Sequence, residues 1–227
     1  MDPVKITIDG KEVTTAKGKT VIQVADELGV AIPRYCYHPK LSIAGNCRMC
    51  LVEIEKMPKL QIACNTQVAE GMSVLTQSPK VLAVRKAVLE FLLINHPLDC
   101  PICDQAGECK LQEYSVDYGK SESRFVEAKV HKPKRVDLGP RIVLDDERCI
   151  LCTRCIRFTK DVVGDDALGI ISRGSFNTLT AYPGSQVITS PVVETKLAEH
   201  PFDSLTAPSR TRSSRSRCAS SPTGRGR

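Results

Sequence analysis

The chain has 227 residues, enough for one large domain or a few small ones, and only 4% of them are aromatic. No segment approaches the long apolar run of a membrane span, so we expect no direct span. The net charge is +6, but seven basic and three acidic residues stand from Val187 onward, which leaves +2 for the rest. Because that part has no basic stripe with interleaved aromatics, we expect no nucleic-acid partner.

The N-terminal 78 residues predict a small α+β domain. Residues 4–9 alternate apolar and polar side chains, Asp9-Gly10 is a turn signal, and residues 11–15 can return as a second strand. A helix is expected between Thr20 as its N-cap and Gly29 as its stop. Further short strands are expected at residues 51–54, 59–63 and 72–76.

The rest of the chain predicts helices, loops and a polar tail. Ser78-Pro79 starts a helix whose apolar stripe ends near His96, and residues 79–118 form the second predicted domain. Residues 119–140 are expected to be a linker. The third predicted domain, residues 141–186, has a strand at 141–144, a helical stretch at 150–159 and a strand-and-turn region after it. Residues 187–227, rich in Ser, Arg and Pro, are expected to be a disordered tail.

Ten of the eleven cysteines fall into three runs of short spacing. Residues 1–5 lack the apolar core of a secretory signal, so we expect a cytosolic protein whose thiols stay reduced. Dense thiols in that compartment indicate metal binding rather than disulfides. Closely spaced redox centres with no substrate pocket between them would carry electrons. The chain has no dinucleotide or phosphate loop and no nucleophile–base pair, so no catalytic residue is predicted.

The first run consists of Cys36, Cys47, Cys50 and Cys64. Its spacing, C-x10-C-x2-C-x13-C, is a variant of the plant-type [2Fe–2S] pattern with a longer first loop. Gly45 permits the close backbone approach through which N–H groups can hydrogen-bond to sulfur. A zinc site with four cysteine ligands is the alternative, although the preceding hairpin and helix favour a ferredoxin-like grasp fold.

The second run consists of His96, Cys100, Cys103 and Cys109. A lone histidine after a helix is as often a surface or capping residue as a ligand, but here three cysteines follow within a few residues. One histidine and three cysteines suit either zinc or an iron–sulfur cluster, and this run by itself leaves both open.

The third run, Cys149-x2-Cys152-x2-Cys155, is the most specific of the three. Cysteines at this double spacing form a compact loop that grips three corners of a [4Fe–4S] cube, and zinc sites rarely use it. The fourth ligand must come from elsewhere, and its usual signal is a cysteine followed by proline. Beyond this run the only cysteine is Cys218, which is followed by Ala219.

Four stretches together resemble a known family. They are residues 32–39 (IPRYCYHP), 45–53 (GNCRMCLVE), 96–112 (HPLDCPICDQAGECKLQ) and 149–155 (CILCTRC). In this order they resemble the N-terminal iron–sulfur region of the large, 75 kDa-type iron–sulfur subunit (the G-type subunit) of respiratory NADH–quinone oxidoreductase, complex I. The resemblance runs from about Val4 to Gln186.

The resemblance implies an α+β fold, with a β-grasp [2Fe–2S] ferredoxin-like domain followed by small cluster-binding helical and loop domains. It implies a [2Fe–2S] cluster on the first run and [4Fe–4S] clusters on the second and third, which favours iron over zinc. Electrons would enter from a flavin-bearing partner that oxidises NADH and leave toward the quinone-module subunits. The chain would have no NADH site of its own and would lie in the cytoplasm, peripheral to the inner face of the cell membrane.

The chain departs from the family's pattern after Gln186. The family has a fourth cysteine in a Cys-Pro segment not far beyond this point, and usually a large molybdopterin-oxidoreductase-like domain after it. The sequence here changes to the Ser/Arg/Pro-rich tail instead, which suggests a truncated or frame-shifted product. A Cys-Pro codon pair in another reading frame of the gene would support this hypothesis, and its absence would contradict it.

Two alternative functions remain from the sequence. The small diaphorase subunit of an NAD-linked hydrogenase shares these motifs and is similarly short, so a neighbouring hydrogenase gene would favour it. A non-redox zinc scaffold that only binds partners belongs to a different class. Colour separates the two classes, because zinc proteins are colourless and iron–sulfur proteins are brown.

Overall fold

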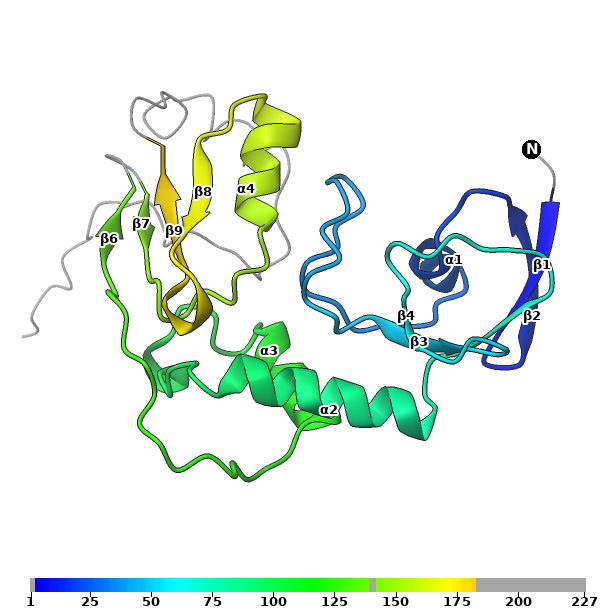
Figure 1. Ribbon diagram of the computed structural model, residues 1–227, viewed down its shortest axis with the longest axis horizontal. Helices are drawn as coiled ribbons and strands as arrows, with labels where there is room; N and C mark the ends of the chain where they lie inside the picture. Colours follow the sequence, from blue (N-terminus) through cyan, green and yellow to red (C-terminus); the bar gives the residue numbers. More distant parts are fainter. Residues whose placement is uncertain (1–2, 139–141, 183–227) are drawn as a thin grey trace, which may run out of the picture.

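The computed structural model describes residues 3–138 and 142–182, and begins with a mixed five-stranded sheet (Figure 1). The strand order is β2-β1-β5-β3-β4, in which β1 and β5 run parallel and the other neighbours antiparallel. The strands are β1 (Pro3–Ile8), β2 (Lys11–Ala16), β3 (Leu51–Ile54), β4 (Gln61–Ile62) and β5 (Met72–Leu75). Helix α1 (Val21–Glu27) buries its apolar side against this sheet in one core. The expected α+β class and β-grasp arrangement are therefore confirmed.

The predicted turn and helix start of the first domain are found in the structure. Asp9 and Gly10 both adopt positive φ, +46° and +80°, which suits the tight turn between β1 and β2. The backbone N–H of Thr20 donates to the side chain of Gln23 at 2.9 Å and so completes the start of α1. Strand β4 is shorter than predicted because the chain turns after Ile62, whose carbonyl accepts from the backbone N–H of Asn65 and of Thr66.

Two helices carry the chain away from the sheet. Helix α2 (Pro79–Leu93) starts as predicted, with the Ser78 hydroxyl accepting from the Val81 N–H at 3.4 Å. A short 3₁₀ turn, η1 (Cys100–Ile102), is followed by helix α3 (Lys110–Tyr118), which packs beside α2. The sequence analysis missed α3, although Leu111, Tyr114 and Tyr118 recur at helical spacing and belong to one apolar cluster.

The third part is built on two small hairpins (Figure 1). Strand β6 (Val136–Asp137) pairs with β7 (Val143–Leu144), and β8 (Leu168–Ile171) with β9 (Thr178–Ala181). The 3₁₀ turn η3 (Gly174–Phe176) lies between the last two strands. Strand β6 lies inside the segment predicted to be a linker. It forms by pairing with β7, which lies beyond that segment, so the linker residues by themselves do not reveal it. Helix α4 (Arg154–Phe158) continues into a π-helical turn, η2 (Thr159–Val163).

Helix α4 starts later than the predicted helical stretch 150–159. The reason is the backbone of Leu151 and Thr153, which adopt positive φ of +53° and +62° and cannot continue a right-handed helix. The predictions for the tail 187–227 and for Cys218 lie outside the described residues. Among the described helices, none combines the length and apolarity that crossing a membrane requires.

Candidate iron–sulfur sites

The first cysteine run is assembled by the edge of the sheet. Cys36 and Cys47 lie on the long loop between α1 and β3, Cys50 directly precedes β3, and Cys64 follows β4. The pairing of β3 with β4 therefore brings Cys50 and Cys64 to the same end of the sheet. Cys36, Cys50 and Cys64 are at most 1% exposed, and Cys47 is half-buried. All four members of the first run are thus close together and largely buried from solvent.

The four thiols are arranged as two hydrogen-bonded pairs. The hydrogen bond with Cys47 lowers the pKa of Cys36 to about 5, and the hydrogen bond with Cys64 lowers the pKa of Cys50 to about 7. The same hydrogen bonds, followed by burial, raise the pKa of the partner thiols Cys47 and Cys64. Two pairs of adjacent thiols suit two metal atoms that each take two sulfur ligands, which is the ligand pattern of a [2Fe–2S] cluster.

The backbone of this loop directs N–H groups at sulfur. The Cys36 N–H donates to the Cys47 Sγ at 3.5 Å, and the Asn46 and Cys47 N–H groups further stabilise the Cys36 thiolate. Arg48, between Cys47 and Cys50, has a positive φ of +58°, and so does Gly45 at +61°, where a Cβ atom would stand 3.1 Å from Ile62. Left-handed residues turn successive N–H groups to one side, so the donor set fits an anionic sulfur cluster.

The second run lies on short turns between α2 and α3. His96 follows the end of α2, Cys100 opens the turn η1, Cys103 follows it, and Cys109 caps α3. Cys100 is exposed, while Cys103 and Cys109 are half-buried. Burial, and then the charges of Lys129 and Arg148, lower the pKa of His96 and favour the neutral imidazole that binds metals.

The second run is more exposed than the first, because its Cys100 is exposed. In none of the three runs, all of which lie within the described parts of the chain, do three His, Cys, Asp or Glu side chains close around a single point as the ligands of one metal ion would. The ligand types still suit a [4Fe–4S] cluster, whose ligands lie at separate corners. Asp99, which stands between His96 and Cys100, forms ion pairs with Lys134 at 2.5 Å and with Arg148 at 3.3 Å. These ion pairs connect the second run to the third part of the molecule.

The third run has Cys149 and Cys152 on a compact loop before α4 and Cys155 in the first turn of that helix. Burial is the main reason that the pKa values of Cys149, Cys152 and Cys155 are raised, that of Cys155 to about 12. The thiols are close enough to raise one another's pKa values by charge repulsion. The left-handed Leu151 and Thr153 lie between them and supply the sharp turns of the loop. The run thus offers three corners of a [4Fe–4S] site, and the remaining candidate, Cys218, lies outside the described residues.

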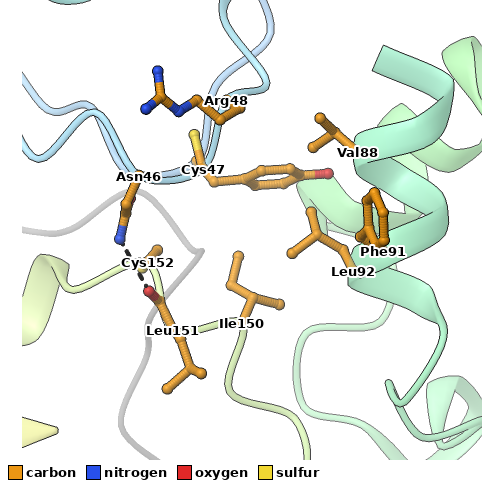
Figure 2. Close-up of a pocket in the computed structure, with 10 residues that line it drawn as sticks. Asn46, Cys47, Arg48, Val88, Phe91, Leu92, Ile150, Leu151 and Cys152 are labelled. Atoms are coloured by element: carbon orange, nitrogen blue, oxygen red, sulfur yellow. Dashed lines mark hydrogen bonds between the residues drawn. The ribbon is translucent and has the colours of Figure 1, made fainter. Parts of the chain in front are cut away.

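Cysteines of all three runs meet in one apolar cluster. Its buried members are Tyr35, Cys36, Met49, Leu89, Leu111 and Cys152, and Cys47 and Cys109 pack against them. A cavity of about 350 Å³ lies between the Cys47 loop, helix α2 and the Cys152 loop (Figure 2). The three sites are therefore neighbours around a shared apolar centre.

The sequence analysis missed three buried arginines. Arg85 of α2 is fully buried, and the charge of its guanidinium acts on the Cys50 thiol. Arg154 and Arg157 of α4 are also buried, and their charges act on the thiols of the first and third runs. Arg154 lies within the third run and Arg157 directly after it, and this position could have indicated their role. Arginine is ordinarily a surface residue, so their burial was not expected. Three features occur together here: thiols in pairs with cations near them, N–H groups directed at sulfur, and an apolar centre shared by the three runs. Together they define an iron–sulfur protein.

Family models match three stretches of the chain. They are a 2Fe-2S iron-sulfur cluster binding domain (residues 1–79), the NADH-ubiquinone oxidoreductase-G iron-sulfur binding region (85–124) and the NADH-quinone oxidoreductase subunit 3 ferredoxin-like domain (139–193). Each match contains one of the three cysteine runs. The predicted cofactor classes, [2Fe–2S] and [4Fe–4S], are therefore confirmed.

Curated relatives point to the same family. The G-type subunit of NADH-quinone oxidoreductase from Rickettsia bellii is 50% identical over 179 residues, which are 79% of this chain and 26% of that protein. The mitochondrial 78 kDa subunit of NADH-ubiquinone oxidoreductase from Neurospora crassa is 52% identical over 173 residues, 76% of this chain and 23% of that protein. The matched part of this chain belongs with the iron–sulfur region of these G-type subunits of NADH-quinone oxidoreductase, and the chain spans about a quarter of the length of these relatives.

A solved structure shares the fold over most of the chain. It is a chain of an NAD+-reducing [NiFe]-hydrogenase in the H2-reduced state, 31% identical, with a TM-score of 0.72. The match covers 80% of this chain and 76% of the hydrogenase chain. The fold of most of this chain therefore also occurs in a hydrogenase chain.

Proposed function

We propose that this chain is an electron-transfer subunit of NADH–quinone oxidoreductase that relays electrons from an NADH-oxidising, flavin-bearing subunit toward quinone. The identity of about 50% to the G-type relatives supports this assignment over other iron–sulfur proteins. The flavin subunit and the quinone-module subunits are the proposed partners. The proposed location is peripheral, at the cytoplasmic face of the cell membrane, as part of that complex.

The proposed ligands follow the three runs. A [2Fe–2S] cluster is assigned to Cys36, Cys47, Cys50 and Cys64, in residues 1–78. A [4Fe–4S] cluster is assigned to His96, Cys100, Cys103 and Cys109, in residues 79–118. After a connecting segment at 119–140, a second [4Fe–4S] cluster is assigned to Cys149, Cys152 and Cys155, in residues 141–186. Such clusters, when bound, supply one-electron transfer.

The observation that carries the proposal is the shared apolar cluster around Tyr35. Cys36 and Cys47 from the first run, Cys109 from the second and Cys152 from the third all belong to it. Side-chain contacts within this cluster hold the ligand loops of the three runs at fixed separations, which is what a relay of electrons needs. The chain's own part is to bind and place the redox groups, and NADH binding is assigned to the partner.

The diaphorase subunit of an NAD-linked hydrogenase is the second candidate. One observation favours it, because the chain covers 76% of the hydrogenase chain but about a quarter of the G-type relatives. The higher identity to the G-type relatives favours the first candidate. Purification of the complex from its native cell separates the two, since quinone-module membrane proteins identify the first and a nickel-containing hydrogenase the second.

The proposal is tested by iron and acid-labile sulfide per chain, together with EPR of the dithionite-reduced protein after anaerobic purification. About ten irons would correspond to one [2Fe–2S] and two [4Fe–4S] clusters, with Cys218 or an outside ligand completing the third site. About six irons with one signal of each type would mean that the third site is not assembled in this chain. A colourless protein with zinc in place of iron would contradict the proposed function.

A further inference from the structure

Two arginines of α4 connect the third cysteine loop to the first. The Arg157 guanidinium donates to the carbonyl oxygens of Cys36 at 2.5 Å, of Ser42 at 2.5 Å and of Cys152 at 3.3 Å. Arg154 donates to the carbonyl oxygen of Tyr37 at 2.6 Å. Arg157 thus binds directly to one residue of the first run and one of the third, although these lie more than 100 residues apart in the chain.

Two further hydrogen bonds join the same loops. The Ser42 N–H donates to the Asp161 carboxylate at 2.8 Å. The Asn46 side-chain amide donates to the Leu151 carbonyl at 3.2 Å, the contact drawn as a dashed line in Figure 2. The loop that carries Cys36 and Cys47 is therefore held along its length by the segment from Leu151 to Asp161.

The arginines are buried at an energetic cost. Arg154 is 5% exposed and Arg157 8%, and their hydrogen bonds go to neutral carbonyl and hydroxyl oxygens. The Asp161 carboxylate lies close enough to interact with the charge of Arg157. Two nitrogens of Arg154, Nε and Nη1, have no hydrogen-bond partner within the described residues. Burial of a guanidinium carries a desolvation cost unless an opposite charge compensates it. The thiols of Cys36, Cys47 and Cys152, which carry negative charge as cluster ligands, are the groups that the charge of Arg154 stabilises.

We propose that Arg157, with Arg154 beside it, is a positioning residue that holds the first and third cluster sites together and raises the reduction potential of the first. This inference rests on the proposed function, because it requires a cluster at the first site. It goes beyond that function because it names two residues that are not cluster ligands and assigns them an effect on the reduction potential of the first cluster.

The physical reason is charge. Reduction of a cluster by one electron, taken from the flavin subunit in the complex or from dithionite in solution, adds one negative charge to the site. A fixed cation close by in a place of low dielectric stabilises the reduced form more than the oxidised form. The hydrogen bonds to the Cys36 and Cys152 carbonyls keep the guanidinium in that position, so the charge cannot swing away to water.

The test is a potentiometric EPR titration of the [2Fe–2S] signal in the full chain, purified anaerobically. Arg157→Gln removes the charge and keeps part of the hydrogen bonding, while Arg157→Lys keeps the charge. The matched control is Lys160→Gln, which removes a positive charge at an exposed position three residues away, where Lys160 pairs with Asp166. Iron and sulfide contents are measured for every variant.

For Arg157→Gln we expect a lower midpoint potential at unchanged [2Fe–2S] iron. At a fixed potential, the ratio of reduced to oxidised cluster should fall about tenfold, which is 59 mV for a one-electron couple. The potentials of Arg157→Lys and Lys160→Gln should stay close to that of the original chain. An unchanged potential in Arg157→Gln overturns the proposal, and so does an equal fall in Lys160→Gln.

Loss of the cluster in Arg157→Gln has its own follow-up. Arg154→Gln is then titrated instead, because Arg154 makes a single hydrogen bond to the first loop but acts on the same thiols. A fall of its potential supports the proposal, and an unchanged value overturns it. If the unaltered chain itself shows no iron–sulfur signal, the proposed function fails together with this inference. A normal signal without a variant shift removes only the inference.

Discussion

The first and second cysteine runs differ in what holds them in place. The first lies at the end of a five-stranded sheet, with Cys50 and Cys64 buried beside a continuous apolar core. The second lies on turns around a single 3₁₀ turn, and its Cys100 is exposed. We therefore expect the sheet to preorganise the first site by its own packing, and the second site to depend on the metal for part of its folding free energy. Two predictions test this contrast directly, and two more test the contacts that join these regions to the rest of the molecule.

Removal of iron should have the largest effect, and mainly on the second region. When iron is stripped anaerobically by a chelator, amide hydrogen exchange in residues 96–109 should accelerate at least about a hundredfold, because few buried contacts remain there. Exchange in β1 and β5 should change by less than about threefold, because their hydrogen bonds lie within the sheet. Equal acceleration in both regions, measured by mass spectrometry, would contradict the contrast.

Replacing one ligand in each region should remove one cluster and leave the other. Cys64→Ser should abolish the [2Fe–2S] EPR signal while the sheet still folds, because Ala63 and Val68 keep its core packed around the site. Cys100→Ser should abolish a [4Fe–4S] signal and, in addition, loosen residues 96–109. Circular dichroism and EPR on both variants check this. Loss of both signals in either variant would show that the two sites assemble as one unit.

Leu89→Ala should weaken the connection between the regions. Leu89 is fully buried in the cluster that Cys36 shares with Leu111 of α3, so the cavity should lower the free energy of unfolding by about 2–5 kcal/mol. Leu82→Ala, on the same helix but 39% exposed, should cost less than about 1 kcal/mol. Denaturant titration of the iron-loaded proteins measures both, and equal losses would mean that the packing around Leu89 contributes little.

Asp161→Asn should have the smallest effect. The hydrogen bond from Ser42, and then the charge of Arg157, lower the pKa of Asp161. Because the folded pKa is lowered, the carboxylate stabilises the folded chain above the ordinary aspartate pKa, and this contribution is lost as the pH falls through the folded value. The substitution should therefore cost less than about 1 kcal/mol at neutral pH and nothing in strong acid. Asp166→Asn is the control, because Asp166 is also exposed but pairs with Lys160 instead of the first loop. Thermal unfolding across pH compares the two variants.

Turns and helix starts that depend on a few neighbouring residues could be predicted from the sequence. The Asp9-Gly10 turn, the start of α1 after Thr20 and the start of α2 at Ser78 are all encoded by short-range hydrogen bonds and backbone preferences. Helix α3 was missed because it is short and its apolar residues Leu111, Tyr114 and Tyr118 stand among polar ones. The left-handed conformations of Leu151 and Thr153 carry no local signal, since neither residue is glycine or asparagine.

The sequence by itself determined the kinds of ligand and their spacing, and its family resemblance indicated the classes of cluster. Spacing is local only within short stretches such as Cys47-x2-Cys50 and the third run, whereas the pairing of β3 with β4 brings Cys64 to Cys50. Only the tertiary structure decided that the loop of Cys36 lies on α4 and that Arg157 stands between the first and third sites. These contacts join carbonyl groups, which every residue has, so no residue type marks them. Their partners are brought together by packing of the whole chain.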